Sequence, residues 1–313
     1  MKKMFMAVIA LMMTISASAQ FYIYFSDGTV AKVDSISLIA PGEPEHPDPS
    51  ADIGTFSVSA DKQVTFSKGN LQYTQSTNTW SFAENQYDYL GEANLAIDAD
   101  VLADKIDLFG WSTSATNFGV STSTDNNDYS GSFVDWGTNK IGNDAPNTWR
   151  TLTYDEWYYL LNNRNNASSL CGIAQVNGVN GLILLPDNWT CPSGVSFKSG
   201  FHSNYGVGYY AAYQTFTAAE WSKLEAAGAV FLPASGFRSS HVNAVQYLGY
   251  YWSATEFTGN YAGSLDFYSG EARMSNLDRY GRFYGYSVRL VKDLQQEHPD
   301  FVRSEATTKS DNM

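Results

Sequence analysis

Hydrophobic and polar residues alternate in several short segments of this chain, and the alternation predicts strands. Residues 56–67 and 70–83 each show the pattern on both sides of a polar turn. Alternation places apolar side chains on one face of a strand, so each segment predicts an antiparallel hairpin. Residues 21–40 show the same pattern around Asp27 and Gly28, a dipeptide favoured in tight hairpin turns.

Two stretches predict helices, and both begin with the pattern T-x-x-E-W. In the first, Thr153 precedes Glu156 by three residues; in the second, Thr217 precedes Glu220 by the same spacing. This is a capping box, in which the threonine and glutamate side chains bond each other's backbone N–H. Gly228 predicts the end of the second helix.

The first nineteen residues have the features of a secretory leader. Lys2 and Lys3 precede an apolar run over 4–15, and Ala17 and Ala19 supply the small residues of a cleavage signal. The run is too short to span a bilayer. We therefore expect a signal peptide over 1–19 and an exported chain, secreted or associated with the cell surface. Because no cysteine lies near the predicted cut, we do not expect a lipoprotein.

Changes in composition divide the remaining chain into four segments. Residues 20–40 are the hairpin segment, and 41–52 contain four prolines, which is typical of an extended linker. Residues 53–292 are long enough to form one domain with a substantial core. Residues 293–313 are polar without a hydrophobic period and predict a disordered tail.

The charge balance excludes two classes of partner. The chain has a net charge of −13, and loss of Lys2 and Lys3 with the leader changes it to −15. A protein this acidic repels phosphate backbones and anionic lipids. We therefore expect neither nucleic acid nor a membrane surface as partner, and no integral membrane segment in the mature chain.

Cys171 and Cys191 are the two cysteines of the sequence. In an oxidising, exported setting a disulfide between them is the plain expectation, and it would contribute roughly 3 kcal/mol on the chain-entropy model. Two unbonded thiols are the main alternative. A redox or nucleophilic role has little support, since no His or Lys lies near either cysteine in sequence to lower its pKa.

The first helix also carries adjacent carboxylates, Asp155 and Glu156. A glycosidase needs two carboxyl groups that face each other across a sugar. Neighbouring residues on a helix point about 100° apart, so these two do not form such a pair. A pair formed with carboxylates elsewhere in this acidic chain stays open.

Metal chemistry has weak support in the sequence. His202 and His241 are the only histidines of the main domain, and no zinc-ligand spacing occurs. Asp125, Asp128 and Asp135 lie close together in a polar loop, but the spacing is not that of an EF-hand. We expect no cofactor, with an irregular calcium loop at these aspartates as the alternative.

Several ordered motifs resemble a known family. They are "WRTLTYDEWYYLLNNR" (149–164), "LPDNW" (185–189), "AAGAVFLPASGFR" (226–238), "GYYWSATE" (249–256) and "GYSVRLVKD" (285–293). Together they resemble the major paralogous domain of exported proteins from gut anaerobes (the Fibrobacter type). The resemblance implies an α+β, C-type-lectin-like fold similar to formylglycine-generating enzymes, with two helices, short twisted antiparallel sheets and long loops.

The functional residues of those relatives are missing. Formylglycine-generating enzymes use a cysteine pair in their C-terminal half, whereas the last cysteine here is Cys191. Sugar-binding C-type lectins use E-P-N or Q-P-D with W-N-D, and none of these triplets occurs. The resemblance therefore implies neither formylglycine-type oxidation nor calcium-dependent sugar binding.

Residues 238–289 also resemble the variable region of retroelement-diversified target proteins, which use this fold for adaptable binding. Tyrosine and asparagine suit such surfaces, because tyrosine adds rigid amphipathic area and asparagine adds adaptable hydrogen bonds. The candidate ligand-binding residues are Arg238, Tyr247, Tyr250, Tyr251, Asn260, Tyr261, Asn276, Asp278, Tyr280 and Tyr284. Tyr268 is of the same type. Val288 and Leu290 are instead expected in the core.

The sequence thus predicts an exported, non-enzymatic protein that binds a glycan or a surface protein. Two alternatives stay open. One is a structural or accessory component of a cell-surface assembly, with the hairpin of residues 21–40 as its docking element. The other is an enzyme whose active site the sequence does not reveal.

Overall fold

The computed structural model describes residues 21–24, 30–33, 53–94, 104–257, 260–275 and 281–294. The predicted signal peptide and linker lie outside these ranges, as does nearly all of the predicted tail. The chain divides into two compact units, residues 1–47 and 48–313. In the first unit, β1 (Phe21–Tyr24) pairs antiparallel with β2 (Val30–Val33), which confirms the hairpin.

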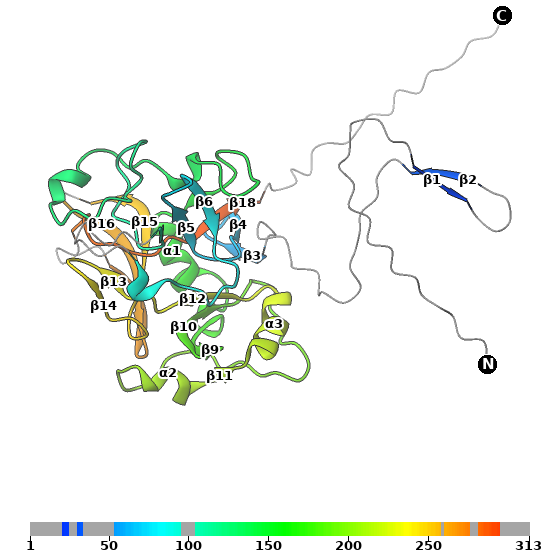
Figure 1. The fold of residues 1–313 in the computed structure, drawn as a ribbon. Helices are drawn as coiled ribbons and strands as arrows, with labels where there is room; N and C mark the ends of the chain where they lie inside the picture. Colours follow the sequence, from blue (N-terminus) through cyan, green and yellow to red (C-terminus); the bar gives the residue numbers. More distant parts are fainter. Residues whose placement is uncertain are drawn as a thin grey trace, which may run out of the picture. The chain divides into compact units, whose positions relative to one another are not determined.

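The second unit is an α+β domain of several small sheets with few helices (Figure 1). One sheet has the order β3-β4-β18-β8 and joins the beginning of the domain to its end. Its strands are β3 (Ile53–Ser57), β4 (Gln63–Phe66), β8 (Arg150–Thr151) and β18 (Leu290–Asp293). A neighbouring segment forms the sheet β6-β5-β7, with β5 (Leu71–Thr74), β6 (Thr79–Phe82) and β7 (Lys105–Ile106). The two predicted hairpins, β3–β4 and β5–β6, are confirmed.

A third sheet, of order β11-β9-β10-β12, lies beside two helices (Figure 1). Its strands are β9 (Cys171–Val176), β10 (Val179–Leu184), β11 (Thr215–Phe216) and β12 (Val230–Pro233). The helices are α2 (Gly208–Tyr213) and α3 (Ala218–Ala226). Trp221 and Leu224 of α3 are buried with Ile183 and Phe231 of the sheet. The helix therefore covers the sheet with its apolar side.

The sheet β15-β16-β17 contains the two longest strands of the described chain (Figure 1). Its strands are β15 (Gly249–Glu256), β16 (Ala262–Tyr268) and β17 (Glu271–Ser275). The short pair β13 (Phe237–Arg238) and β14 (Val242–Asn243) precedes it. Val288 and Leu290 are fully buried, as predicted.

Both predicted capping boxes are present. The hydroxyl of Thr153 accepts the N–H of Glu156, and that of Thr217 accepts the N–H of Glu220. The first box starts α1 (Tyr154–Tyr158), which continues as a π-helical turn, η4 (Tyr159–Asn163). Gly228 follows α3 with φ +93°, and its N–H and that of Ala229 bond back to the last turn. This is a Schellman ending, for which glycine is suited.

Residues 111–147 contain short 3₁₀ turns and isolated bridges, and no longer helix or strand. The 3₁₀ turns of the described chain are η1 (Gly91–Ala93), η2 (Asn126–Tyr129), η3 (Trp136–Thr138) and η5 (Ala167–Ser169). Aromatic rings anchor this segment in the core, among them its own Trp111 and Trp136, which are both fully buried. In the described residues, no helix has the length and apolar character that crossing a membrane requires.

The two arginines of the first helical segment have structural partners. Arg150 Nη1 lies 2.7 Å from Glu156 Oε2, and Arg150 Nη2 lies 2.7 Å from Asp293. Arg164 is buried, donates to the carbonyls of Leu160 and Leu185, and lies 3.2 Å from Asp187. These side chains connect distant segments of the domain, and the segment 149–164 is scaffold rather than an active site.

The predicted disulfide is wrong in this structure. Cys171 and Cys191 are both free thiols, the first buried and the second exposed. Cys171 begins β9 and belongs to the hydrophobic core, while Cys191 lies on a loop, where its thiol donates to the carbonyl of Val195 at 3.6 Å. A buried strand position and an exposed loop position leave the two thiols unpaired.

Candidate functional site

A pocket of about 250 Å³ opens at one end of the sheet β15-β16-β17. Four tyrosines line it together with one acid and one base, and Leu248 and Phe267 complete the wall. We call it the tyrosine pocket, formed by Tyr205, Tyr247, Tyr250, Asp266, Tyr268 and Arg273. It combines rings with a few polar groups, as small-molecule sites do.

The register of the sheet explains why these side chains meet. Tyr250 of β15 pairs with Asp266 of β16, which in turn pairs with Arg273 of β17. Residues directly opposite on neighbouring strands point to the same face. A tyrosine, a carboxylate and a guanidinium thus form one row across three strands.

The same register sends the neighbouring tyrosine to the opposite face. Tyr251 is fully buried and packs with Leu265 and Phe267 in the core. Its hydroxyl donates to the carbonyl of Pro233 and accepts from Asn70. Tyr251 is therefore a core residue, and its selection as a ligand contact is wrong.

Asp266 is the most unusual group of the pocket. It is 4 % exposed, its Oδ2 accepts from Arg273 Nε at 3.1 Å, and its Oδ1 has no hydrogen-bond partner among the described residues. Burial raises the pKa of Asp266 to about 6, although the nearby Arg273 opposes that rise. Oδ1 of Asp266 is thus a buried acceptor whose hydrogen-bonding capacity is unused.

Tyr268 and Tyr205 form the outer part of the wall. Their rings meet edge to face, with centroids 5.2 Å apart. The hydroxyl of Tyr268 donates to Glu271 Oε1 at 2.9 Å, and Arg273 Nη1 donates to the same oxygen. Tyr205 is 65 % exposed, more than any other large hydrophobic side chain of the described residues. Exposed aromatic rings at a pocket mouth suit stacking against a ligand.

The loop that carries Tyr205 is fixed by one buried serine at the β16–β17 turn. Ser269 accepts the N–H of Gly206 at its hydroxyl and the N–H of His202 at its carbonyl. The hydroxyl also donates to the carbonyl of Asn204. These bonds hold the loop against the hairpin, so Tyr205 is positioned before any ligand arrives.

Tyr247 is fixed from a different direction, by a strained loop. Ala244 and Gln246 both have positive φ, +56° and +64°. Asn180 holds the loop, because its N–H and its side-chain amide donate to Gln246. The buried hydroxyl of Tyr210 on α2 donates to the carbonyl of Tyr247. Left-handed non-glycine residues occur often at binding sites, where surrounding bonds maintain them.

The remaining candidates do not join this pocket. Arg238 is buried, and its Nη2 donates to the carbonyls of Leu108 and Ser121, so it is not a surface contact. Tyr284 stacks on Phe283 and meets Phe237 edge to face. Asn260 and Tyr261 lie by Gly281 and Arg282, to which their backbones are bonded. Asn276, Asp278 and Tyr280 lie outside the described residues.

The weak calcium candidates are engaged in other roles. Asp125 and Asp135 each cap a 3₁₀ turn by accepting a backbone N–H, and Asp135 also accepts from Thr151. Asp128 is exposed. Across the described ranges, no group of three His, Cys, Asp or Glu side chains is arranged to hold a metal ion.

The sequence pointed to Tyr247 and Tyr250 but missed Tyr205, Asp266 and Arg273 as partners. A signal for Asp266 existed, since it lies between Leu265 and Phe267 in an apolar strand, where a carboxylate is costly. Tyr205 had no local signal, because its place depends on a loop far away in sequence. No protein-family model, curated protein or solved structure matches this chain.

Proposed function

We propose that this chain is an exported, non-enzymatic binding protein that takes a glycan in the tyrosine pocket. One observation carries the proposal: four tyrosine side chains line one pocket together with a guanidinium that is paired with a buried carboxylate. Export follows from the leader predicted over residues 1–19.

The chemistry of the pocket favours a polyhydroxylated ligand. A sugar hydroxyl accepts as well as donates, so it can accept from the half-exposed guanidinium of Arg273, which Asp266 holds in place. The apolar C–H faces of a sugar ring fit against tyrosine rings, whose hydroxyls stay at the wet edge.

Charged ligands fit the pocket less well. Arg273 lies against Asp266 and Glu271, at 3.1 and 2.6 Å. A cationic ligand would meet this guanidinium, and an anionic ligand would meet a guanidinium whose charge two carboxylates already balance. The mixed pair therefore supports a neutral glycan.

The fold of the second unit supports the proposal that this unit is a C-type-lectin-like domain. Its two capped helices, its small and mostly antiparallel sheets and its long loops are in line with what the sequence resemblance implies, while α2 is a further helix and the β9–β11 pair is parallel. Pairing of β4 with β18 brings the two ends of the domain into one sheet. The pocket is formed by strands β15, β16 and β17 together with the loops that carry Tyr205 and Tyr247.

Binding is favoured over hydrolysis as the activity of this pocket. A glycosidase needs two carboxyl groups that flank the scissile bond. Asp266 lines the pocket, whereas Glu271 is held outside it by Tyr268 and Arg273. One carboxylate at the ligand is sufficient for recognition.

An array of immobilised glycans tests the proposal. The wild-type chain should bind a defined subset of neutral glycans, and the double variant Tyr205→Ala/Tyr268→Ala should lose at least one of those signals by about tenfold or more. Circular dichroism of the double variant establishes that it is folded. No glycan binding by the wild-type chain, or an unchanged profile for the folded variant, would contradict the proposal.

A further inference from the structure

A second hollow region lies away from the tyrosine pocket, between the sheet β6-β5-β7 and the loop 114–122. It consists of two pockets of about 350 and 340 Å³, which share Tyr73, Asn117 and Val120 in their walls. We call the two together the amide groove. Each lies in the size range of small-molecule sites, about 300–1,000 Å³.

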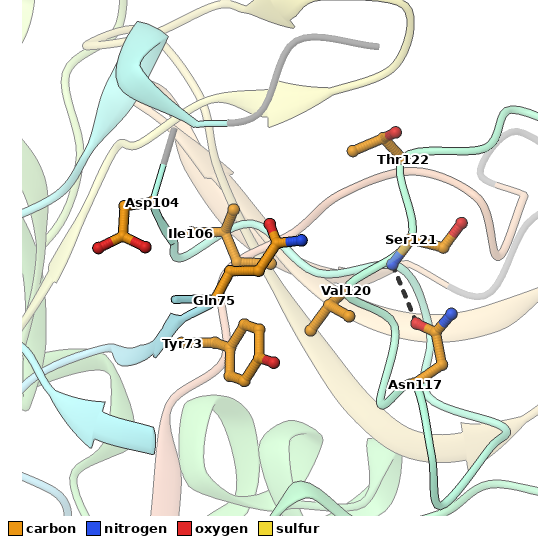
Figure 2. A pocket seen from close by; sticks show the side chains of 8 residues that line it. All are labelled: Tyr73, Gln75, Asp104, Ile106, Asn117, Val120, Ser121 and Thr122. Atoms are coloured by element: carbon orange, nitrogen blue, oxygen red, sulfur yellow. Dashed lines mark hydrogen bonds between the residues drawn. The ribbon is translucent and has the colours of Figure 1, made fainter. Parts of the chain in front are cut away.

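The first of the two pockets has a clear division of walls (Figure 2). Tyr73, Ile106 and Asp104 lie on the sheet side, and Asn117, Val120 and Ser121 lie on the loop side. The side chain of Gln75 extends between them. Among the described residues, none hydrogen-bonds to the Gln75 side chain, so its amide is available to a ligand.

Aromatic rings form a continuous floor into the second pocket. Tyr73 lies on Trp80 with centroids 4.7 Å apart, and Trp80 meets Phe118 edge to face at 5.7 Å. The hydroxyl of Tyr73 donates to Asn78, which fixes its ring. Aromatic rings in a pocket wall offer apolar surface to a flat or chair-shaped ligand.

The loop side of the groove is rigid. Phe118 and Gly119 both have positive φ, +49° and +72°. The carbonyl of Phe118 accepts from Trp136, the carbonyl of Gly119 accepts from Gly110, and the side chain of Asn117 accepts the N–H of Ser121. A Cβ on Gly119 would lie 1.9 Å from the carbonyl oxygen of Gly110, so only glycine fits there. A strained bulky residue held by such bonds is typical of binding sites.

The polar groups of the groove are almost all neutral. Gln75, Asn117 and Asn139 contribute amides, and Thr116 and Thr122 contribute hydroxyls. Among the residues that the structure describes, Asp104 is the one charged side chain lining either pocket, and hydrogen bonds from Ser76 hold its pKa below the usual range. Amides donate and accept at once, as sugar hydroxyls do, while the carboxylate disfavours acidic sugars.

We infer that the amide groove is a second carbohydrate site that binds an extended, neutral oligosaccharide. The inference rests on the proposed glycan-binding function and adds a site and a ligand class to it. Sugar rings lie against Tyr73 and Phe118, which Trp80 supports from the core, and the amides of Gln75 and Asn117 bond their hydroxyls.

The test uses Asn117→Asp in the full chain. Aspartate has nearly the shape of asparagine and keeps the oxygen that caps Ser121, but it loses the amide donor and adds a charge inside the groove. Asn165→Asp is the matched control, since it adds the same charge at an exposed turn. Wild type and both variants are applied to an array of neutral and acidic oligosaccharides of increasing length, and to an array of neutral peptides.

The inference predicts that Asn117→Asp weakens binding of a set of longer neutral oligosaccharides about tenfold or more, while Asn165→Asp leaves them unchanged. One of these oligosaccharides should also slow hydrogen exchange in residues 114–122 of the wild-type chain. If the wild type binds neutral glycans and Asn117→Asp binds them equally well, the inference is overturned and the tyrosine pocket stands. If the Asn117-sensitive binding is to peptides, the ligand class is overturned. If the wild type binds no glycan, the proposed function and this inference both fail.

Discussion

Arg273 holds only one oxygen of Asp266. Its Nε lies 3.1 Å from Oδ2, whereas Oδ1 of the same carboxylate is buried without a hydrogen-bond partner among the described residues. An unused buried acceptor costs about 1–3 kcal/mol. Because Oδ1 is closed to solvent, a ligand in the pocket meets this ion pair through the half-exposed guanidinium of Arg273.

The pH dependence of stability follows from this carboxylate. Burial raises the pKa of Asp266 to about 6, from 3.8 in the unfolded chain. The folded state therefore holds this proton more tightly than the unfolded chain does, and the bound proton stabilises the fold. This stabilisation is present below about pH 4 and is lost as the pH rises to about 6. Relative to Asp266→Asn, the wild type should lose roughly 3 kcal/mol of unfolding free energy across that window.

Denaturant unfolding of both proteins at about pH 4 and pH 7 measures this change, and NMR titration of the carboxyl carbon gives the midpoint. Asp128→Asn is the control, since it removes an exposed carboxylate. A carboxyl that titrates near its ordinary value of 3.8 would show that Asp266 is solvated and would remove the pH argument.

Gly270 provides a probe of ring position. A Cβ at this residue would lie 2.6 Å from the ring of Tyr268 and 2.8 Å from that of Tyr205. Gly270→Ala should displace both rings and weaken glycan binding by about three- to tenfold, at a stability cost below about 1 kcal/mol because the rings can move.

Gly208→Ala is the matched control for that substitution. It adds the same methyl group at the start of α2, where nothing lies within 4 Å. Titration with an array-selected glycan and thermal unfolding compare the two variants. Equal glycan affinity for both would mean that the two rings do not contact the ligand.

The capping boxes predict a graded loss of stability. Thr217→Ala and Thr153→Ala should each cost about 1 kcal/mol, within a range of about 0.5–2. Glu156→Gln should cost more than Thr153→Ala, since Glu156 accepts from Thr153, Arg150 and Lys62 together. Urea unfolding measures each loss. A negligible effect of Glu156→Gln would show that its ion pairs do not stabilise the fold.

The cysteines should behave as two unlike thiols. Cys191 should react with a thiol reagent in the native protein, and Cys171 only after unfolding, because Cys171 is buried and burial raises its pKa. Thiol counting before and after denaturation measures both. If instead the unfolded chain has no reactive thiol and its electrophoretic mobility changes on reduction, Cys171 and Cys191 form the disulfide that the sequence predicts.

The sequence predicted the features whose signals are local. Thr153 and Glu156 are three residues apart, so their capping box could be recognised without knowledge of the fold. Tyr250 and Tyr251 are neighbours of the same type and both are buried, and only the register with β16 decides that Tyr250 also lines the pocket while Tyr251 packs on the opposite face. Tyr205 reaches the pocket through bonds to Ser269, 64 residues further along the chain, which no local pattern encodes.

The central claim is tested most directly by paired titrations of an array-selected neutral glycan into Tyr205→Ala and Tyr158→Ala. Both substitutions remove an exposed tyrosine, one at the pocket and one on α1. We predict that Tyr205→Ala loses about tenfold or more in affinity, with a melting temperature within about 2 °C of the wild type, and that Tyr158→Ala binds normally. Equal affinity for the two variants would contradict the assignment of the tyrosine pocket as the glycan site.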